Sequence, residues 1–494
     1  MEDFKRRMEQ LAEAEPNRLA VQFKEHQLTY SNLLDSLRRL ETQLGAFTGM
    51  RLLTVLPDGF VPYLLMVYCF NAKSTIIPLS IHSVTSHIEN ICLKIKPHLV
   101  VTTEILYKKH QGLLEKYPCV ITKPQGHMAQ GEIVVDFAWN SAVPSLPIKS
   151  TRESEQIQLM LFTSGTTGAP KGVCLSQSNI TAAASMMLDF LSLGPNRRSL
   201  VTVPLYDYYG LIQIFGHVLA GASFIFGENI ALPGGLIKRI ASDQVTDLVL
   251  VPYTLRRLLQ IIGEEERHVM QNLEVITSSS DVLSDDILDR TFQLNSKLKI
   301  FNIYGLTEAG RACYREITAT SSPSRSIGRP SKGVEVQING TKSEPGEIVL
   351  RGPNVMKGYF QEVQSDRIVF LPCAEVPTGD LGYFDENGEI ILLGRRDHMM
   401  NLMGVKIHPS EIESIALKIP GVREAFAYIS VNGQGEPSVC LDVVLSDGQV
   451  DTDAISTQMR SGLPRMFVPA TIDVVTQILR TELGGKILRR REQS

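Results

Sequence analysis

The residues with the clearest capacity for chemistry lie in one stretch, Thr163–Gly172, which reads Thr-Ser-Gly-Thr-Thr-Gly-Ala-Pro-Lys-Gly. Glycines let backbone N–H groups approach a ligand closely, hydroxyl groups donate hydrogen bonds, and Lys171 adds a positive charge. The stretch therefore predicts a phosphate-binding loop. It is not a nucleotide P-loop, because that motif has a Ser or Thr directly after its lysine, where this chain has Gly172. A Mg²⁺ ion bound with the phosphates must take its protein ligand from elsewhere.

Strand and helix patterns alternate on both sides of this loop. Helices are predicted at 5–13, 29–45, 58–71, 86–96, 235–242, 253–262 and 284–294, and strands at 52–56, 75–79, 99–101, 247–251, 273–276 and 298–301. Such alternation is typical of parallel sheets that helices cover on both faces. Residues 122–156 are polar and weakly patterned, which predicts a surface connection.

Ligands of such sheets bind beyond the carboxyl ends of the strands. Chemistry is therefore expected at Ser278–Ser280 and at Tyr304–Glu308, which follow two predicted strands. From about residue 325, short strands and glycine turns predict a small β subdomain. Beyond Gly394 a compact α+β unit is predicted, with helices at 409–419 and 452–461 and strands at 424–430, 438–445 and 471–476. The expected fold class is α/β.

Length, charge and composition limit the functions that the chain can have. A length of 494 residues predicts two to four domains. A net charge of −4 gives no reason to expect a nucleic-acid partner. The seven cysteines are scattered without metal-ligand spacing, which is typical of buried thiols in a reducing compartment. The N-terminus lacks an apolar signal core and no run is long enough to span a membrane, so we expect a cytoplasmic protein.

Four motifs occur in order along the chain: Thr163–Gly172, Tyr304–Glu308, Thr378–Gly382 with Gly394–Asp397, and Gly484–Arg490. In this order and spacing the chain resembles the adenylate-forming superfamily of acyl-CoA synthetases, non-ribosomal peptide adenylation domains and luciferases. The resemblance extends from Leu28 to Lys486. It implies a large N-terminal domain with covered mixed and parallel sheets, residues 1–396, and a small mobile C-terminal domain, residues 397–494.

The resemblance also implies a two-step reaction and a role for individual residues. A carboxylate attacks the α-phosphate of ATP and releases pyrophosphate, and a thiol then takes the acyl group. The phosphate loop is represented by Thr163, Ser164, Gly165, Thr166, Thr167 and Lys171. In the second motif, Tyr304 resembles the ring against adenine, next to Gly305, while Thr307 resembles the hydroxyl that contacts the α-phosphate. Glu308 resembles the Mg²⁺ ligand, and an oxygen ligand suits that cation.

In the third motif, Asp380 resembles the carboxylate that accepts both ribose hydroxyls, assisted by Arg395. In the C-terminal region, Lys486 resembles the catalytic lysine, Asp397 the hinge between two orientations of the domain, and Gly404 the face that lines the thiol's entry. The sequence departs from the family at Ser279 and Ser280, where a glycine pair is usual beside adenine. It departs again at Lys406, where arginine is common and where lysine cannot reproduce a bidentate contact.

The acid substrate is indicated by Asp207, which stands where many acyl-CoA synthetases carry histidine and amino-acid-activating members carry aspartate. Asp207 is expected to be buried and to have a cation nearby, because an unpaired buried carboxylate is costly. An amino-acid substrate would supply its ammonium group. Arg311 would serve instead, as an internal pair, in an enzyme for an uncharged acyl or aryl acid.

The acceptor and the exact activity stay open at this stage. No carrier-protein serine motif follows Lys486, so we expect a standalone ligase whose thiol is CoA or the phosphopantetheine of a separate carrier protein. A luciferase-like oxygenase would use the same motifs. A regulatory relative would be expected to have lost Glu308 or Lys486, and both are present.

Overall fold

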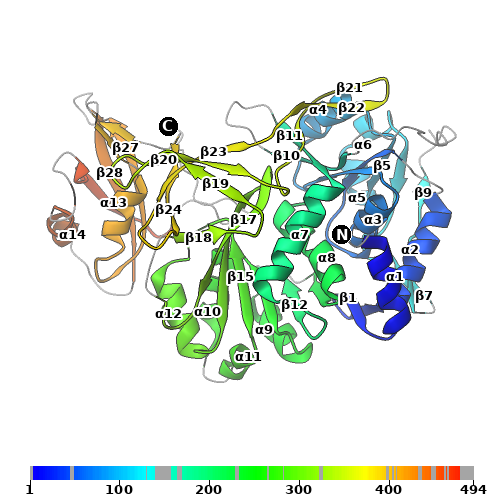
Figure 1. The fold of residues 1–494 in the computed structure, drawn as a ribbon, viewed down its shortest axis with the longest axis horizontal. Coiled ribbons are helices and arrows are strands. Elements are labelled where there is room, and N and C mark those ends of the chain that lie inside the picture. Colours follow the sequence, from blue (N-terminus) through cyan, green and yellow to red (C-terminus); the bar gives the residue numbers. More distant parts are fainter. Residues whose placement is uncertain are drawn as a thin grey trace.

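The computed structural model describes residues 4–44, 49–129, 131–139, 157–163, 170–227, 233–263, 266–281, 283–321, 326–396, 400–402, 405–407, 409–431, 437–446, 452–460, 463 and 467–478. Over these residues the chain is an α/β protein with two large sheets and a smaller unit at the C-terminal end (Figure 1). No helix in this part of the chain is long and apolar enough to cross a membrane.

The first large sheet contains the strand that leads into the predicted phosphate loop. Its strands, in spatial order, are β22 (Arg367–Pro372), β21 (Gly358–Gln364), β11 (Lys171–Ser176), β10 (Ile157–Thr163), β4 (Thr75–Leu79), β3 (Arg51–Val55), β5 (Leu99–Thr102), β6 (Cys119–Ile121) and β9 (Ala138–Trp139). From β10 to β6 the neighbours are parallel. β3 and β4 are buried along their whole length, as expected for strands that are covered on both faces.

The helices that connect the strands of the first large sheet follow those strands in the chain. They are α3 (Phe60–Asn71), α4 (Thr85–Ile95), α5 (Glu104–Lys109) and α6 (Gln111–Leu114). Almost every residue of α3 is buried. This burial explains why its sequence is apolar on all sides and shows no amphipathic pattern.

The second large sheet contains the strands that lead to the other predicted site residues. Its spatial order is β19 (Glu335–Ile338), β20 (Gly346–Arg351), β23 (Val376–Phe384), β24 (Ile390–Arg395), β18 (Ser326–Pro330), β17 (Ala309–Ile317), β16 (Lys299–Leu306), β15 (Val275–Ser279), β14 (Asp247–Leu250), β12 (Arg198–Val201), β13 (Ser223–Phe226), β1 (Leu19–Phe23) and β2 (His26–Thr29). The strands β16, β15, β14, β12, β13 and β1 form its parallel part.

The helices of the second half connect these parallel strands. They are α7 (Gln177–Leu191), α8 (Tyr208–Ala220), α9 (Pro233–Ser242), α10 (Pro252–Ile261), α11 (Arg267–Gln271) and α12 (Asp285–Leu294). The start of α7 is fixed by a capping box, in which the Ser176 hydroxyl accepts from the Asn179 N–H and the Asn179 side chain accepts from the Ser176 N–H.

One apolar core joins the two sheets. It extends from the N-terminal helices α1 (Phe4–Ala14) and α2 (Tyr30–Leu44) through α3 to α8. The rings of Phe4, Phe70 and Phe215 meet at its centre, with centroids 4.5–5.2 Å apart. A shared, densely packed core fixes the two sheets relative to each other.

The C-terminal unit lies at one end of the molecule and has its own apolar core (Figure 1). It consists of α13 (Pro409–Ala416), α14 (Thr452–Met459) and a three-stranded sheet of β27 (Val422–Val431), β28 (Pro437–Leu445) and β29 (Thr471–Val474), preceded by the pair β25 (Met400–Leu402) and β26 (Val405–Ile407). The Ser410 hydroxyl donates to the Leu393 carbonyl at 2.5 Å, which connects this unit to β24.

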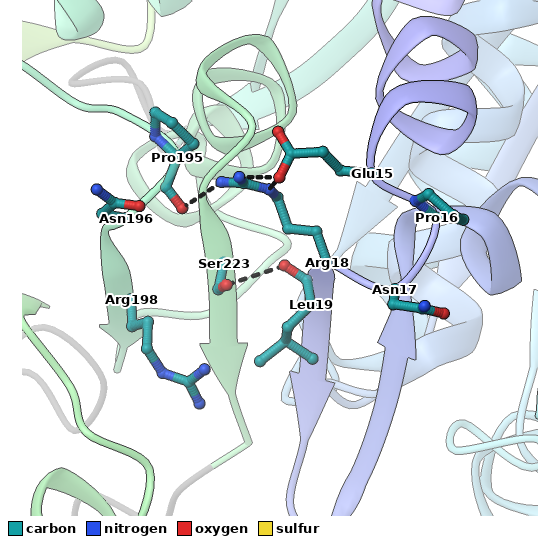
Figure 2. Close-up of a pocket in the computed structure, with 9 residues that line it drawn as sticks. All are labelled: Glu15, Pro16, Asn17, Arg18, Leu19, Pro195, Asn196, Arg198 and Ser223. Atoms are coloured by element: carbon teal, nitrogen blue, oxygen red, sulfur yellow. Dashed lines mark hydrogen bonds and ion pairs between the residues drawn. The ribbon is translucent and has the colours of Figure 1, made fainter.

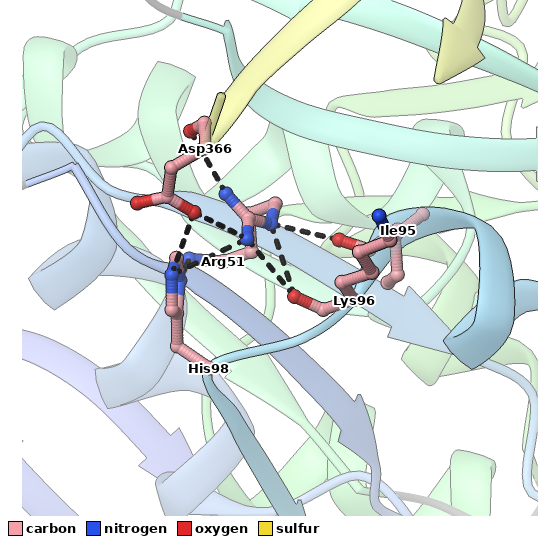
Figure 3. A network of polar contacts seen from close by, with 5 residues as sticks. All are labelled: Arg51, Ile95, Lys96, His98 and Asp366. Carbon is pink, nitrogen blue, oxygen red and sulfur yellow. Dashed lines mark hydrogen bonds and ion pairs between the residues drawn. The ribbon is translucent and has the colours of Figure 1, made fainter. Parts of the chain in front are cut away.

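The hairpin formed by β21 and β22 is anchored at its turn (Figure 3). Arg51, on β3, is buried; its Nη2 lies 2.7 Å from Asp366 Oδ1 and its Nη1 donates to the Asp366 carbonyl at 3.1 Å. His98 Nε2 lies 3.1 Å from the same carboxylate oxygen. The Arg51 Nε also donates to the Ile95 carbonyl at 2.7 Å. These contacts fix the far end of the hairpin against the first sheet.

The predicted α/β class is confirmed, and every predicted helix and strand is present within a few residues of its expected bounds. The strands of the small β subdomain pack around an apolar core of their own and also extend the two large sheets. Two expectations need correction. The segment 122–156 is not a plain connection, because it contains the hairpin of β7 (His127–Ala129) and β8 (Glu132–Val134) as well as β9. In addition, β16 continues to Leu306, so Tyr304 lies within the strand.

Candidate active site

The two ends of the predicted phosphate loop lie side by side. Thr163 ends β10 and pairs with Lys171 at the start of β11. Residues 164–169, which include Ser164, Gly165, Thr166 and Thr167, lie outside the described part of the chain, and their roles stay predictions. Lys171 is exposed, and its Nζ lies 5.4 Å from the centroid of the Tyr359 ring, within cation–π range.

Tyr359 connects the phosphate-loop lysine to the predicted metal ligand. Its hydroxyl donates to Glu308 Oε1 at 2.9 Å. Burial, followed by the charge of Glu308, raises the pKa of Tyr359, so the hydroxyl keeps its proton. Lys171 and Tyr359 belong to the first sheet, whereas Glu308 lies at the tip of the β16–β17 hairpin of the second sheet. The site is therefore built where the two sheets meet.

This hairpin tip is the two-residue turn Thr307–Glu308, since Leu306 pairs with Ala309. A short segment fastens it to the first sheet. The Met356 N–H donates to the Glu308 carbonyl at 2.8 Å, and the Lys357 N–H donates to the Cys174 carbonyl, on β11, at 2.9 Å. These main-chain bonds hold the Glu308 carboxylate near the end of the phosphate loop.

A second cluster joins the residues predicted to hold the nucleoside. The Tyr304 hydroxyl donates to Asp380 Oδ2 at 2.6 Å, and Arg395 Nη1 lies 3.6 Å from Asp380 Oδ1. Asp380 and Arg395 are cross-strand partners on β23 and β24. Arg395 Nη1 also donates to the Thr378 carbonyl at 2.7 Å. Burial, and then the Asp380 charge, raises the pKa of Tyr304, which keeps its hydroxyl a donor. Tyr304 and Arg395 together fix the orientation of the Asp380 carboxylate.

Ser279 and Ser280 lie next to the Tyr304 strand. Ser279 pairs with Ile303, and its hydroxyl donates to the Ile303 carbonyl at 2.8 Å. Ser280 adopts φ 80°, a left-handed conformation that glycine takes more easily. The backbone here therefore follows the path expected of the usual glycine pair, although serine occupies the position.

The two clusters are four residues apart in the sequence, at Tyr304 and Glu308, and offer complementary chemistry. Lys171 can contact phosphate, and Glu308 supplies a carboxylate. No group of three or more potential metal-binding side chains occurs among the described residues. Mg²⁺ typically binds through one or two carboxylates together with substrate phosphates, so Glu308 fits an ion that is carried by a nucleotide.

A surface pocket of about 560 Å³ lies elsewhere and contains none of the predicted site residues (Figure 2). It forms where residues 15–19 meet residues 195–198 and Ser223. Its Arg18 donates to the carboxylate of Glu15 and to the Pro195 carbonyl, so this arginine has a structural role.

Comparison with known families identifies the family to which the chain belongs. Residues 8–360 match the family described as AMP-binding enzyme. The chain belongs to the AMP-binding enzyme family. The resemblance inferred from the four motifs is thereby confirmed, together with the expected class of AMP-forming ligase.

Individual relatives of this AMP-binding enzyme cover it almost completely. It is 26% identical over 500 residues to a 2-succinylbenzoate–CoA ligase of Bacillus licheniformis, covering 98% of each chain. It is similar in structure to ATP-bound MatB from Rhodopseudomonas palustris, with a TM-score of 0.78, 21% identity and coverage of 97% and 96%. It is also similar to MenE from Bacillus subtilis in complex with ATP and magnesium ion, with a TM-score of 0.76, 21% identity and 98% coverage of each chain.

The AMP-binding enzyme differs from expectation at Asp207 and Arg311. Asp207 precedes α8 and is exposed, so the premise of a buried carboxylate is wrong. Arg311 is buried with 3% exposure, and no ion pair joins it to Asp207. Its guanidinium lies over the Tyr209 ring, 4.8 Å from the centroid. The alternative in which Asp207 and Arg311 form an internal pair is therefore not what the structure has.

Three predicted residues of the C-terminal region lie outside the described residues. They are the hinge Asp397, the thiol-entry residue Gly404 and the catalytic Lys486. Their roles stay predictions, as does the domain boundary at residue 397.

Sequence reasoning missed Tyr359 entirely. It lies in a strand fifty residues beyond Glu308, in Gly358-Tyr359-Phe360, and no short motif marks it. Its neighbour Gly358 has φ 156° and a Cβ there would come within 1.9 Å of the Leu371 carbonyl, so the glycine is the one local signal of a constrained strand.

Proposed function

We propose that this enzyme activates a small carboxylic acid with ATP, forming an acyl-adenylate and pyrophosphate, and then transfers the acyl group to the thiol of CoA. The observation that carries the proposal is the position of the Tyr304–Glu308 segment between two clusters. At one end Tyr304 contacts the Asp380–Arg395 pair, and at the other Glu308 contacts Tyr359 beside Lys171. A nucleotide placed along this segment would meet nucleoside-binding groups first and phosphate-binding groups second.

Each residue then has a defined task. Asp380, held by Tyr304 and Arg395, accepts hydrogen bonds from the ribose hydroxyls. Lys171 and the Thr163 end of the loop orient the β- and γ-phosphates, and Thr307 contacts the α-phosphate. Mg²⁺, held by Glu308, would neutralise charge that develops on the phosphates. Lys486 would offset the charge of the pentavalent phosphorus centre.

CoA is the proposed acceptor because relatives that the chain covers almost end to end are CoA ligases. The phosphopantetheine of a separate carrier protein is the alternative. The two differ in a direct assay, since thioester formation with free CoA as the sole thiol supports the first. Thioester formation that requires a carrier protein would contradict it.

An acid without an ammonium group is the proposed substrate class. Asp207 is exposed at the start of α8, so it gains little from a substrate ammonium compared with water. The buried ion beside this helix is the cation Arg311. A positive substrate group there would be repelled. An amino acid that outperforms its des-amino analogue would contradict this assignment.

The experiment that tests the reaction is ATP–pyrophosphate exchange with a panel of carboxylic acids, combined with identification of the nucleotide product. We expect acid-dependent exchange and the release of AMP. Release of ADP and phosphate would refute the adenylation reaction.

We further propose that residues 397–494 form a domain that rotates about Asp397. One orientation would bring Lys486 to the α-phosphate, and the other would bring the Gly404 face to the thiol's entry. The separate core of the C-terminal unit supports this proposal, because a unit with its own core can move as a body.

A further inference from the structure

Arg311 is a buried cation without a counter-ion in the described part of the chain. It is 3% exposed, and neither its Nε nor its Nη1 has a hydrogen-bond partner there. Its Nη2 reaches the Tyr209 carbonyl, at a long 3.5 Å. A guanidinium stays charged in proteins, and a buried charge is costly unless it is paired.

A bulge in the backbone of β17 sets the position of the Arg311 side chain. Between the pairs Tyr304–Cys313 and Leu306–Ala309, β16 has one residue, Gly305, where β17 has three. Arg311 lies in the middle of this bulge with φ 59°, a left-handed conformation that is strained for a non-glycine residue. Bulges redirect side chains and concentrate next to active sites, where such strain persists for a functional reason.

The bulge directs Arg311 toward α8, on which three more buried side chains have unpartnered polar atoms. These atoms are Tyr208 Oη, Gln213 Oε1 and His217 Nε2. The Gln213 Nε2 donates to the same Tyr209 carbonyl that Arg311 reaches, so the amide and the guanidinium converge. The positive charge of Arg311 also contributes to lowering the pKa of His217, after burial itself.

The site contains donors for an anion as well as the charge. The Tyr208 hydroxyl and the Arg311 Nε and Nη1 groups can all donate. The tautomer of His217 is set by the Gln213 carbonyl, which lies 2.7 Å from its Nδ1. Because a carbonyl can only accept a hydrogen bond, Nδ1 carries the proton. Burial lowers the pKa of His217 to about 4, so the ring is neutral and adds no second positive charge. The Tyr209 ring compensates the buried charge only in part, because a cation–π contact is weaker than a buried ion pair.

We propose that Arg311, with Tyr208 and Gln213, binds a second anionic group on the acyl substrate, a carboxylate or sulfonate distant from the carboxylate that reacts. The proposal rests on the proposed function and assigns its substrate class as diacids. The reacting carboxylate cannot be this partner through the whole cycle, because it loses its charge on becoming an acyl-adenylate. A second anionic group keeps its charge in both steps.

The test compares linear diacids of three to six carbons with monoacids of the same length, by ATP–pyrophosphate exchange. For the best diacid we expect kcat/KM to exceed that of its matched monoacid by roughly 10²-fold or more, as for a buried charge pair. Arg311→Gln should lose that preference, through a fall for the diacid and no fall for the monoacid. Arg38→Gln, at an exposed arginine on α2, is the matched control and should change neither value.

Thermal denaturation gives a readout that does not depend on turnover. The best diacid should raise the Tm of the wild-type protein and leave that of Arg311→Gln unchanged. Without any acid, Arg311→Gln should have an equal or higher Tm, because an uncompensated buried charge has been removed.

The outcomes separate the two proposals. If no acid supports exchange but a diacid still raises the Tm through Arg311, the adenylation reaction is refuted and the anion site stands. If monoacids react as well as diacids, or Arg311→Gln slows both equally, the anion site is refuted and adenylation stands. A Tm that is unaffected by every diacid in the wild-type protein also refutes the anion site.

Discussion

Replacing Tyr359 with phenylalanine isolates one hydrogen bond at the proposed metal site. The substitution removes the hydroxyl that donates to Glu308 Oε1 at 2.9 Å. It keeps the ring, and with it the contact to Lys171. Both Tyr359 and Glu308 are half-buried, so the void left by one oxygen atom is small and accessible to water. The expected effect is therefore on the orientation of the Glu308 carboxylate.

The magnitude follows from the charge of the acceptor. A hydrogen bond to a charged group contributes about 1.5–3 kcal/mol, and partial exposure places this one in the lower half of that range. Since 1.4 kcal/mol corresponds to a factor of ten, we expect the Mg²⁺ concentration for half-maximal activity to rise about 10- to 50-fold. That range agrees with the usual effect of removing a group that orients a metal ligand. At saturating Mg²⁺ most of the activity should return.

The assay is ATP–pyrophosphate exchange at a fixed acid concentration over a Mg²⁺ titration. Tyr383→Phe, which removes a hydroxyl from β23, is the matched control and should leave the titration unchanged. Because the pKa of Tyr359 is raised, the difference between Tyr359→Phe and wild type should not depend on pH across the ordinary assay range. An unchanged Mg²⁺ requirement would show that Tyr359 does not orient the metal ligand. A loss that excess Mg²⁺ cannot restore would place the hydroxyl elsewhere in the reaction.

Four further substitutions test other parts of the molecule. Glu308→Gln should lower kcat at least ~10²-fold in the exchange assay, because a neutral amide binds the metal poorly; near-normal turnover would remove Glu308 from this role. Burial, with a smaller effect from the Asp207 charge, raises the pKa of Asp58 to about 6, above its unfolded value of 3.8. Protonated Asp58 therefore contributes up to about 3 kcal/mol to the free energy of unfolding below pH 4, and this contribution is lost as the pH rises through 6. In thermal melts, Asp58→Asn should abolish this dependence of stability on pH. A pH profile that the substitution leaves unchanged would contradict the assignment. Lys486→Ala should abolish adenylation yet still transfer acyl groups from supplied acyl-adenylate, whereas Asp397→Pro should impair one half-reaction only; equal slowing of both by Asp397→Pro in a folded protein would contradict the hinge.

Periodic sequence patterns predicted most of the fold because its strands and helices are regular. The strand at Thr75–Leu79 was predicted with its observed bounds, since a buried parallel strand is a continuous apolar run. The segment after Ile121 was not, because the β7–β8 hairpin has three residues in each strand, too few to show alternation.

The site was predictable where one motif supplies several groups in a row, and not where a contact depends on distant strands. Tyr304–Glu308 is such a motif. Its partner Tyr359 reaches Glu308 only because the two large sheets share a core, which no local pattern reports. The burial of Arg311 could not be predicted from the sequence either, because it depends on a bulge in β17 and not on residue type. Asp207 was expected to be buried because a motif position implies a role but not an exposure.

The anchored turn of the β21–β22 hairpin has a consequence for protein engineering. Exposed hairpin tips usually tolerate inserted sequences, and Ser365 and Asp366 are exposed and remote from the proposed site. An affinity tag or fluorescent reporter placed between them would nevertheless separate Asp366 from the buried Arg51 guanidinium and release the strand that carries Tyr359. Such a fusion should show a lower Tm and an increased Mg²⁺ requirement together, whereas the same insert after Gly388, in the exposed turn between β23 and β24, should show neither.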